Sequence, residues 1–206
     1  MKKPTAPHGS IAPAKPPHPQ GSPAHEIRII GGQWKRTRLK VADRPGLRPT
    51  PDRVRETLFN WLGQDLTGWR CLDAFAGTGA LGFEAASRGA ASVALVETDA
   101  ALVKQLQATR DRLDATAVQV QRGDGLVALD RAAPSSLDLV LLDPPFDSGL
   151  FDKALAAAAR AVAPGGYVYL EAPLAWTDER VQATGLALYR HLKAGAVHAQ
   201  LLLRPA

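Results

Sequence analysis

The chain has 206 residues, of which 46% are hydrophobic, so it can bury the core of one ordinary domain with appendages. Its formal net charge of +5 is unevenly spread, because residues 1–70 hold 13 Lys and Arg against 5 Asp and Glu, and this favours a polyanionic partner. The single cysteine, Cys71, excludes an intramolecular disulfide, and no apolar stretch approaches the roughly 20 residues of a membrane span.

Residues 1–25 are rich in Pro, Ala, His and Gly, and Ile11 is their only large aliphatic residue after the first position. Such a segment cannot bury enough apolar surface to offset the entropy lost on ordering. We therefore predict a disordered, Pro-rich tail.

Residues 26–41 contain two short apolar runs on either side of Gly31-Gly32, a pattern typical of a β-hairpin. A hairpin alone is marginally stable, so we expect it to lean on the rest of the chain through Trp34 and the helix that carries Trp61. Its second strand is expected to carry a basic row. The residues predicted to contact the phosphates of such a polyanion are Arg28, Lys35, Arg36, Arg38, Lys40 and Arg48.

A helix is predicted after Arg48, with Thr50 as its N-cap and Pro51 at its first helical position. Its apolar face would consist of residues at helical spacing, and Gly63 or Gly68 would end it. The face residues are Val54, Leu58, Trp61 and Leu62. We take residues 26–68 as a basic extension that would bind this polyanion and residues 69–206 as the main domain.

From Trp69 onward, short apolar strands alternate with helical segments. Strands are predicted at 70–75, 92–96, 117–121, 137–142 and 167–171, helices at 80–87, 100–113 and 150–163, and two closing strands at 186–192 and 197–203. Pro164-Gly165-Gly166 is expected to end the last helix. This alternation predicts an α/β fold with a mostly parallel seven-stranded sheet, in which the closing hairpin forces one antiparallel strand.

Residues 77–82 (GTGALG) follow the first of these strands and open a helix, where glycines let the backbone approach a ligand and free N–H groups point outward. Nicotinamide and flavin sites share this motif. Two carboxylates narrow its meaning, because Asp73 precedes the glycines and Glu97 ends the next strand, where it could accept both ribose hydroxyls of an adenosine.

Asp124 follows the third strand and lies beside the same predicted crevice. Its carboxylate could accept a hydrogen bond from an adenine amino group. An ordinary turn aspartate would have the same sequence context, and both interpretations stay open.

Residues 143–146 (DPPF) end the strand 137–142. Two prolines fix the backbone there, so the Asp143 carboxylate and the Pro144 carbonyl can act as paired acceptors for the two hydrogens of a planar amino group. This arrangement would aim the nitrogen lone pair at a methyl donor and stabilise positive charge on the nitrogen. Phe146 offers a face on which a flipped base can stack.

These motifs resemble those of Rossmann-like class I methyltransferases that modify exocyclic amines: residues 72–82 are similar to their motif I and residues 143–146 to their motif IV. Residues 28–62, including RIIGGQWKRTRLKV and RPTPDRVRETLFNWL, resemble the RsmD family of 16S rRNA guanine-N2 methyltransferases. The resemblance implies S-adenosyl-L-methionine as cofactor and Asp143, Pro144 and Phe146 as catalytic residues. It implies cofactor binding by Asp73, Phe75, Gly77, Thr78, Gly79, Glu97 and Asp124.

Other functions fit parts of the pattern. An amino-group methyltransferase could act on adenine N6 or cytosine N4 of DNA or RNA, or on glutamine N5 of a protein, although the latter leaves the basic segment unexplained. An NAD-dependent oxidoreductase would leave DPPF without a role, and a non-catalytic RNA-binding module would leave the acidic residues without one. We expect a cytoplasmic monomer that uses no metal, since its five histidines are scattered, and that acts on ribosomal RNA or the small ribosomal subunit.

Overall fold

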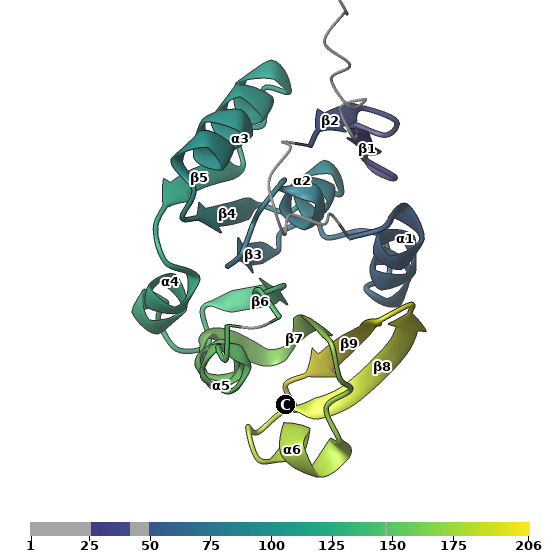
Figure 1. Cartoon of the computed structure of the whole chain (residues 1–206), viewed down its shortest axis with the longest axis vertical. Helices are drawn as coiled ribbons and strands as arrows, with labels where there is room; N and C mark the ends of the chain where they lie inside the picture. The colour runs from purple at the N-terminus through teal and green to yellow at the C-terminus, as the bar shows by residue number, and fades with distance from the viewer. Residues whose placement is uncertain (1–25, 42–49, 147) are drawn as a thin grey trace, which may run out of the picture.

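The computed structural model describes residues 26–41, 50–146 and 148–206, and it contains one large sheet flanked by helices and one small hairpin (Figure 1). The predicted tail and Arg48 lie outside the described residues. The strands are β1 (Glu26–Arg28), β2 (Arg38–Lys40), β3 (Arg70–Asp73), β4 (Ser92–Glu97), β5 (Val118–Arg122), β6 (Leu137–Leu142), β7 (Val162–Ala172), β8 (Ala187–Ala194) and β9 (Val197–Leu203). The helices are α1 (Asp52–Trp61), α2 (Ala80–Ser87), α3 (Ala100–Arg112), α4 (Gly125–Arg131), α5 (Phe151–Ala161) and α6 (Asp178–Gln182).

The large sheet has seven strands in the order β5-β4-β3-β6-β7-β9-β8. All neighbouring pairs from β5 to β7 are parallel, and β9 runs antiparallel to both β7 and β8. The predicted α/β fold, with a mostly parallel seven-stranded sheet and one antiparallel strand, is confirmed. The order reverses between β3 and β6, and ligands of such sheets bind at the carboxyl ends of the strands near this reversal.

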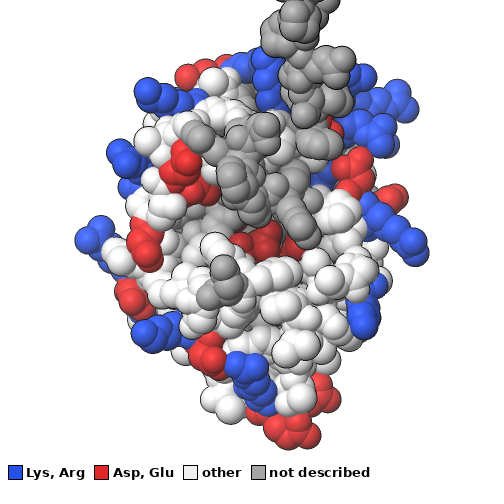
Figure 2. Space-filling model, in the orientation of Figure 1, with Lys and Arg blue, Asp and Glu red and all other residues white. Residues whose placement is uncertain are grey.

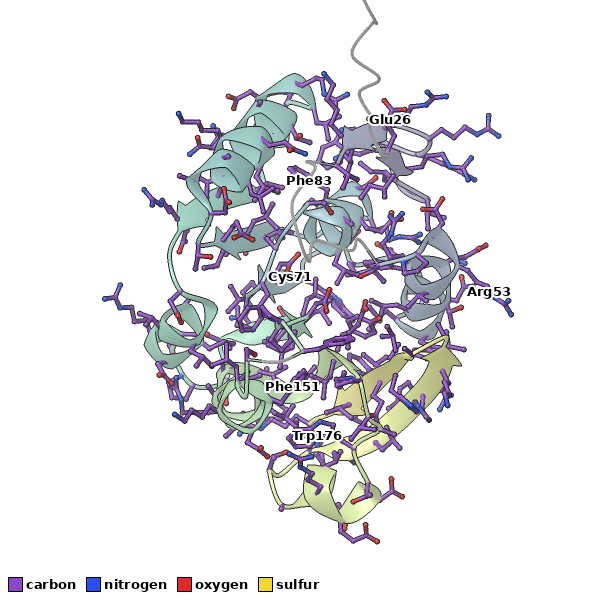
Figure 3. All side chains as sticks on the ribbon, viewed as in Figure 1. Glu26, Arg53, Cys71, Phe83, Phe151 and Trp176 are labelled. Atoms are coloured by element: carbon purple, nitrogen blue, oxygen red, sulfur yellow. The ribbon has the colours of Figure 1, made fainter. Side chains whose placement is uncertain are left out.

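Two apolar layers cover the two faces of the sheet. One joins α1, α2 and α3 to the side chains of Cys71, Leu141 and Tyr169. The other joins α4, α5 and α6 to Leu142 and Leu170. Because successive side chains of a strand point to opposite faces, the central strands are apolar on both sides, as β6 with its sequence LDLVLL illustrates. Phe83 on α2 and Cys71 on β3 lie in the interior, whereas Glu26 and Arg53 lie at the outer edge (Figure 3).

The hairpin differs from the prediction in detail. Its strands have three residues each, so Lys35 and Arg36 lie in the connection between them rather than on the second strand. Gly31-Gly32 does not form a tight turn; it packs against α2, where a Cβ on Gly32 would lie 1.8 Å from the Ser87 carbonyl oxygen. The connection is therefore shaped by the helix beneath it.

Thr50 does not cap α1. Pro51 occupies the N-cap position without a side-chain hydrogen bond, and the Thr50 hydroxyl instead donates to Glu171 on β7 at 2.6 Å. Trp61, predicted as part of the buried face of α1, is only partly buried, and Phe59 takes the interior position.

Pro164-Gly165-Gly166 does not separate helix from strand, because β7 already begins at Val162. Gly165 donates to the Arg204 carbonyl at 2.8 Å, and Arg204 donates back to Gly166 at 3.0 Å, so the segment pairs with the chain beyond β9. Two short helices, α4 and α6, were not predicted. Each begins with a side-chain cap, from Asp124 and Thr177 respectively.

Candidate active site

Four carboxylates stand at the carboxyl ends of four adjacent strands. Glu97 ends β4, Asp73 ends β3, Asp143 follows β6, and Glu171 is the penultimate residue of β7. They occupy the sheet face that α1 and α2 cover, because Leu95, Cys71, Leu141 and Tyr169, two residues earlier on the same strands, all pack in that layer. Figure 2 shows acidic side chains near the middle of one face, set among uncharged ones.

The glycine-rich loop between β3 and α2 is shaped for close approach. Gly77 and Gly79 have φ values of 51° and 78°, and Gly79 is the N-cap of α2. A Cβ on Gly82 would lie 2.1 Å from Leu95 Cδ2, so this third glycine lets α2 pack directly on β4. The loop therefore turns tightly and directs the first N–H groups of α2 toward the strand ends.

Asp73 holds this loop from beneath. It is 2% exposed, and its Oδ2 accepts a hydrogen bond from the Gly82 N–H at 3.1 Å. Burial raises the pKa of Asp73 to about 7, although hydrogen bonds from the backbone N–H groups of Gly82 and Phe75 oppose the shift. Its visible contacts are thus with the loop itself.

Glu97 lies beside the loop on the next strand. Its Oε2 accepts from the Gly77 N–H at 2.9 Å, and its Oε1 accepts from the Asp99 N–H at 2.8 Å. A carboxylate oxygen can accept more than one hydrogen bond, so Glu97 is fixed in place while keeping capacity for hydroxyl donors.

Asp124 caps α4 by accepting from the Val127 N–H at 3.1 Å, and it is exposed. Capping of α4 therefore accounts for one carboxylate oxygen of Asp124, and a contact between Asp124 and adenine stays a prediction.

The residues 143–146 extend from the end of β6 beside Asp73. Burial raises the pKa of Asp143 well above its usual value, and the charges of Glu171 and Asp73 raise it further. Pro144 is buried, whereas Phe146 is 42% exposed, with its ring 6.4 Å from that of Phe151. A partly buried acceptor thus lies close to an aromatic ring that a planar ligand could reach.

Glu171 was not predicted as a site residue. It is 4% exposed, and its Oε1 accepts both the Thr50 hydroxyl at 2.6 Å and the Tyr169 hydroxyl at 2.9 Å. Burial raises the pKa of Glu171, while these two hydrogen bonds and the charge of Arg55 lower it. The signal that found Asp143 and Glu97, an acidic residue at the end of a predicted strand, applies equally to the sequence YVYLE.

The hairpin is anchored on α2 by hydrogen bonds, and it also meets α1 through the ion pair between Arg28 and Asp52. The Ile30 and Gly31 N–H groups donate to Glu84 at 2.8 and 2.7 Å, and the Trp34 N–H donates to the Ser87 hydroxyl at 3.0 Å. From α3, Arg112 donates to the Arg38 carbonyl at 2.9 Å. The hairpin and the glycine loop therefore share one supporting helix.

A buried ion cluster surrounds Glu84. The Glu84 and Arg55 side chains are completely buried and lie 3.3 Å apart, and Arg88 reaches Glu84 at 2.9 Å. Arg55 also contacts Asp52 at 2.5 Å. Together with the two N–H groups from the hairpin connection, the guanidinium groups satisfy both oxygens of Glu84. A lone acid in the otherwise apolar helix sequence ALGFEAAS was the available signal for such a cluster.

The five described residues of the predicted RNA-binding set are all exposed. Arg28 pairs with Asp52 at 3.2 Å and Arg38 with Glu26 at 3.0 Å. Lys and Arg side chains gather around the rim of the molecule, including over the hairpin (Figure 2).

In the described part of the chain, no group of three or more His, Cys, Asp or Glu residues is arranged to hold a metal ion. Within the same ranges, no helix has the length and apolar character needed to cross a membrane.

Comparisons with known proteins agree with this geometry. A family model described as Conserved hypothetical protein 95 matches residues 27–203. The chain is 40% identical over 184 residues to "Ribosomal RNA small subunit methyltransferase D" of Escherichia coli strain K12, which covers 84% of this chain and 92% of that protein. The protein of the same name from Haemophilus influenzae is 37% identical over 179 residues, with coverages of 80% and 92%. The solved structure of yhhF from Escherichia coli superposes with a TM-score of 0.76 at 36% identity, covering 88% of this chain and 99% of that one.

Proposed function

The chain belongs to the RsmD family, described as Conserved hypothetical protein 95, and from this premise we propose that it transfers a methyl group from S-adenosyl-L-methionine to the exocyclic N2 amine of a guanine in small-subunit ribosomal RNA. The observation that carries the proposal is the position of Asp143 and Pro144 at the end of β6, next to the glycine loop. The names of the relatives support methylation of ribosomal RNA, and the choice of guanine and of its N2 amine is our proposal.

The residues present fit the cofactor. The left-handed Gly77 and Gly79 bring no side chain to the part of the loop where the methionine end would lie, and Glu97, held beside the loop by the Gly77 N–H, would accept the ribose hydroxyls. Thr78 lies between the two glycines, and Phe75 and Asp124 flank the same strand ends. When bound, S-adenosyl-L-methionine supplies an electrophilic methyl group on a sulfonium sulfur.

The chain supplies orientation and charge. The Asp143 carboxylate and the Pro144 carbonyl accept the two hydrogens of the target amine, which aims the nitrogen lone pair away from the protein and toward the cofactor side of the site. Positive charge that develops on the nitrogen is stabilised by Asp143 in a poorly solvated position, and Asp143 can hold the proton that the amine loses. Phe146, which is exposed, offers its ring to the extruded base.

The hairpin supplies affinity for RNA. Its exposed arginines and lysines can contact phosphates without reading sequence, and its attachment to α2 keeps them at a fixed distance from the glycine loop. Reversal of Arg36 and Arg38 to Glu should abolish RNA binding while leaving cofactor binding unchanged. Neutralising them to Ala should lower the salt dependence of RNA binding by about one unit of slope for each phosphate that the hairpin no longer neutralises.

A charge reversal of Arg190 and Lys193, which are exposed on β8, is the matched control for the hairpin. It changes net charge equally, so it should affect RNA binding much less. Equal losses in the two double variants, measured by filter binding across a salt series, would assign the effect to overall charge and contradict the role of the hairpin.

The function itself is tested by product analysis. Small subunits from a strain that lacks this protein are incubated with the purified protein and methyl-labelled S-adenosyl-L-methionine, and the RNA is digested to nucleosides. We expect label in N2-methylguanosine. Label in N6-methyladenosine or N4-methylcytosine would show that the target base is adenine or cytosine and not guanine. Calorimetry that detects binding of NAD but not of S-adenosyl-L-methionine would overturn the proposal.

A further inference from the structure

Glu171 has no part in the chemistry described above, although it stands next to Asp143. Leu142 of β6 pairs with Leu170 of β7, so Asp143 and Glu171 are the next residues on two adjacent parallel strands. Such strands lie about 4.8 Å apart. Both side chains point to the face that α1 covers, because Leu142 and Leu170 point to the opposite one.

The Glu171 carboxylate is held by one oxygen. Both hydroxyls that donate to it, from Thr50 and Tyr169, bind Oε1, and no group among residues 26–41, 50–146 and 148–206 donates to Oε2. The side chain is nevertheless 4% exposed. Glu171 is thus a rigidly oriented acceptor with one oxygen uncommitted within the described chain.

Its position relative to the cofactor residues is also defined. The order β4-β3-β6-β7 puts Glu97 and Asp73 on one side of Asp143 and Glu171 on the other. A base whose amine is held by Asp143, with its lone pair toward the cofactor, would therefore present the neighbouring atom of its edge to Glu171.

The chemistry of that neighbouring atom separates guanine from the other bases. In guanine, the ring atom next to the N2 amine on the Watson–Crick edge is N1, which carries a hydrogen and donates. In adenine and cytosine, the ring nitrogen next to the amine carries a lone pair and accepts. An ionised carboxylate has only hydrogen-bond acceptors. It therefore binds the N1–H of guanine and repels the lone pair on the ring nitrogen of adenine or cytosine.

We propose that Glu171 is a specificity-determining residue that accepts the N1–H of the target guanine while Asp143 holds its N2 amine. This inference rests on the proposed function, since it assigns the base to that same site. Burial raises the pKa of Glu171, but the hydroxyls of Thr50 and Tyr169 and the nearby charge of Arg55 oppose this shift and favour the ionised form, which is the form that discriminates.

The first test uses the unaltered protein. Once the methylated nucleotide has been mapped, small-subunit RNA is assembled by ligation with guanine, 2-aminopurine or 6-thioguanine at that position. 2-Aminopurine keeps the amine but has no N1–H, whereas 6-thioguanine keeps both and alters only the 6-position. We expect kcat/KM to fall on the order of 100-fold or more for 2-aminopurine and little for 6-thioguanine. Comparable rates for guanine and 2-aminopurine would overturn the inference, whether or not any variant folds.

The second test links the discrimination to Glu171. In Glu171→Gln, the side-chain amide can still accept from Thr50 and Tyr169 and can donate to the bare ring nitrogen of 2-aminopurine. The preference for guanine over 2-aminopurine should therefore shrink at least about tenfold relative to the unaltered protein. A merely structural role would lower both rates by the same factor and leave the preference unchanged, which would contradict the assignment.

Glu179→Gln, an identical change at an exposed position on α6, is the control and should leave both rates unchanged. The two proposals fail in distinguishable ways. If the unaltered protein labels no guanine in small-subunit RNA, the proposed function fails and this inference with it. If it labels guanine and accepts 2-aminopurine equally well, the proposed function stands and the role of Glu171 fails.

Discussion

Two regions of this molecule bury carboxylates, and they treat them in opposite ways. At Glu84, two guanidinium groups and two backbone N–H groups converge on one carboxylate, all within hydrogen-bonding distance. At the ends of β3, β6 and β7, the buried Asp73 and Glu171 and the partly buried Asp143 lie near one another, and desolvation raises the pKa of each.

This difference in pairing distinguishes a carboxylate that holds the fold together from carboxylates that are suited to bind a ligand. A buried charge that is fully paired fixes the elements that supply its partners, here α1, α2 and the hairpin. Buried acids that repel one another raise the free energy of the empty site, and a ligand that brings hydrogen-bond donors can lower it again. Perturbed acids in this arrangement are typical of reaction sites.

The largest effect is expected where the pairing is broken. Glu84→Gln should lower the free energy of unfolding by about 3–5 kcal/mol, because it leaves the buried Arg88 without its Glu84 counter-charge and leaves Arg55 with Asp52 alone. Urea denaturation measures this change. Glu56→Gln, at an exposed position on α1, is the matched control. Equal stabilities of the two variants would show that the cluster does not fix the helices.

The next effect should appear in rate and not in stability. If Asp143 acts as proposed, Asp143→Ala should lower kcat on the order of 10²–10³-fold, because it removes the acceptor that would stabilise charge on the amine. Its stability should be unchanged or higher, since one member of a repelling group is gone. Asp178→Ala, at an exposed position on α6, should alter neither. If the Asp143→Ala variant were less stable but had normal turnover, Asp143 would have a structural role like that of Glu84, and the distinction between the two regions would be wrong.

Glu97 should show a smaller effect, confined to the cofactor. Glu97→Ala should weaken binding of S-adenosyl-L-methionine by about 1.5–3 kcal/mol, the range for hydrogen bonds to a charged group. Calorimetry measures the change in affinity directly. Unchanged affinity would mean that the carboxylate serves only its neighbours in the described chain, the Gly77 and Asp99 N–H groups and the Thr98 hydroxyl.

The smallest net change in the unfolding free energy is expected at Asp73, where the cost of burying a charge and the gain from a hydrogen bond oppose each other. Its pKa of about 7 in the folded protein exceeds the value of 3.8 expected when unfolded, so the folded protein binds more protons between these values. The contribution of Asp73 to stability is therefore greatest below about pH 4 and is lost as the pH rises to about 7.

Asp73→Asn should flatten this part of the pH profile of the unfolding free energy. At pH 7 the weakened hydrogen bond from Gly82 opposes the gain from removing a buried charge, so the net change in the unfolding free energy should be smaller than that gain alone. A pH profile as steep as that of the unaltered protein would assign the slope to other acids.

The main sheet followed from the sequence because its strands are apolar runs and its turns are glycine-rich. The same pattern of apolar runs also identified Asp143 and Glu97, because each of them stands where a run stops. It could not show that Thr50 turns toward Glu171 instead of capping α1, since that bond joins residues 121 positions apart. Glu84 was missed for a related reason: its partners come from the hairpin, α1 and its own helix, and only the folded chain brings them together.

The core that residues 26–68 share with the sheet bears on how the protein could be shortened. Ile29, Leu58 and Phe59 are at most 1% exposed and pack in the same apolar layer as Leu139 and Tyr169. A protein that began at Trp69 would expose that layer to water and separate Glu84 from Arg55. We expect such a truncated protein to accumulate in inclusion bodies rather than to behave as a free-standing cofactor-binding unit. Exchange of residues 26–68 for another segment would accordingly require the outer side of α2 to be redesigned with it.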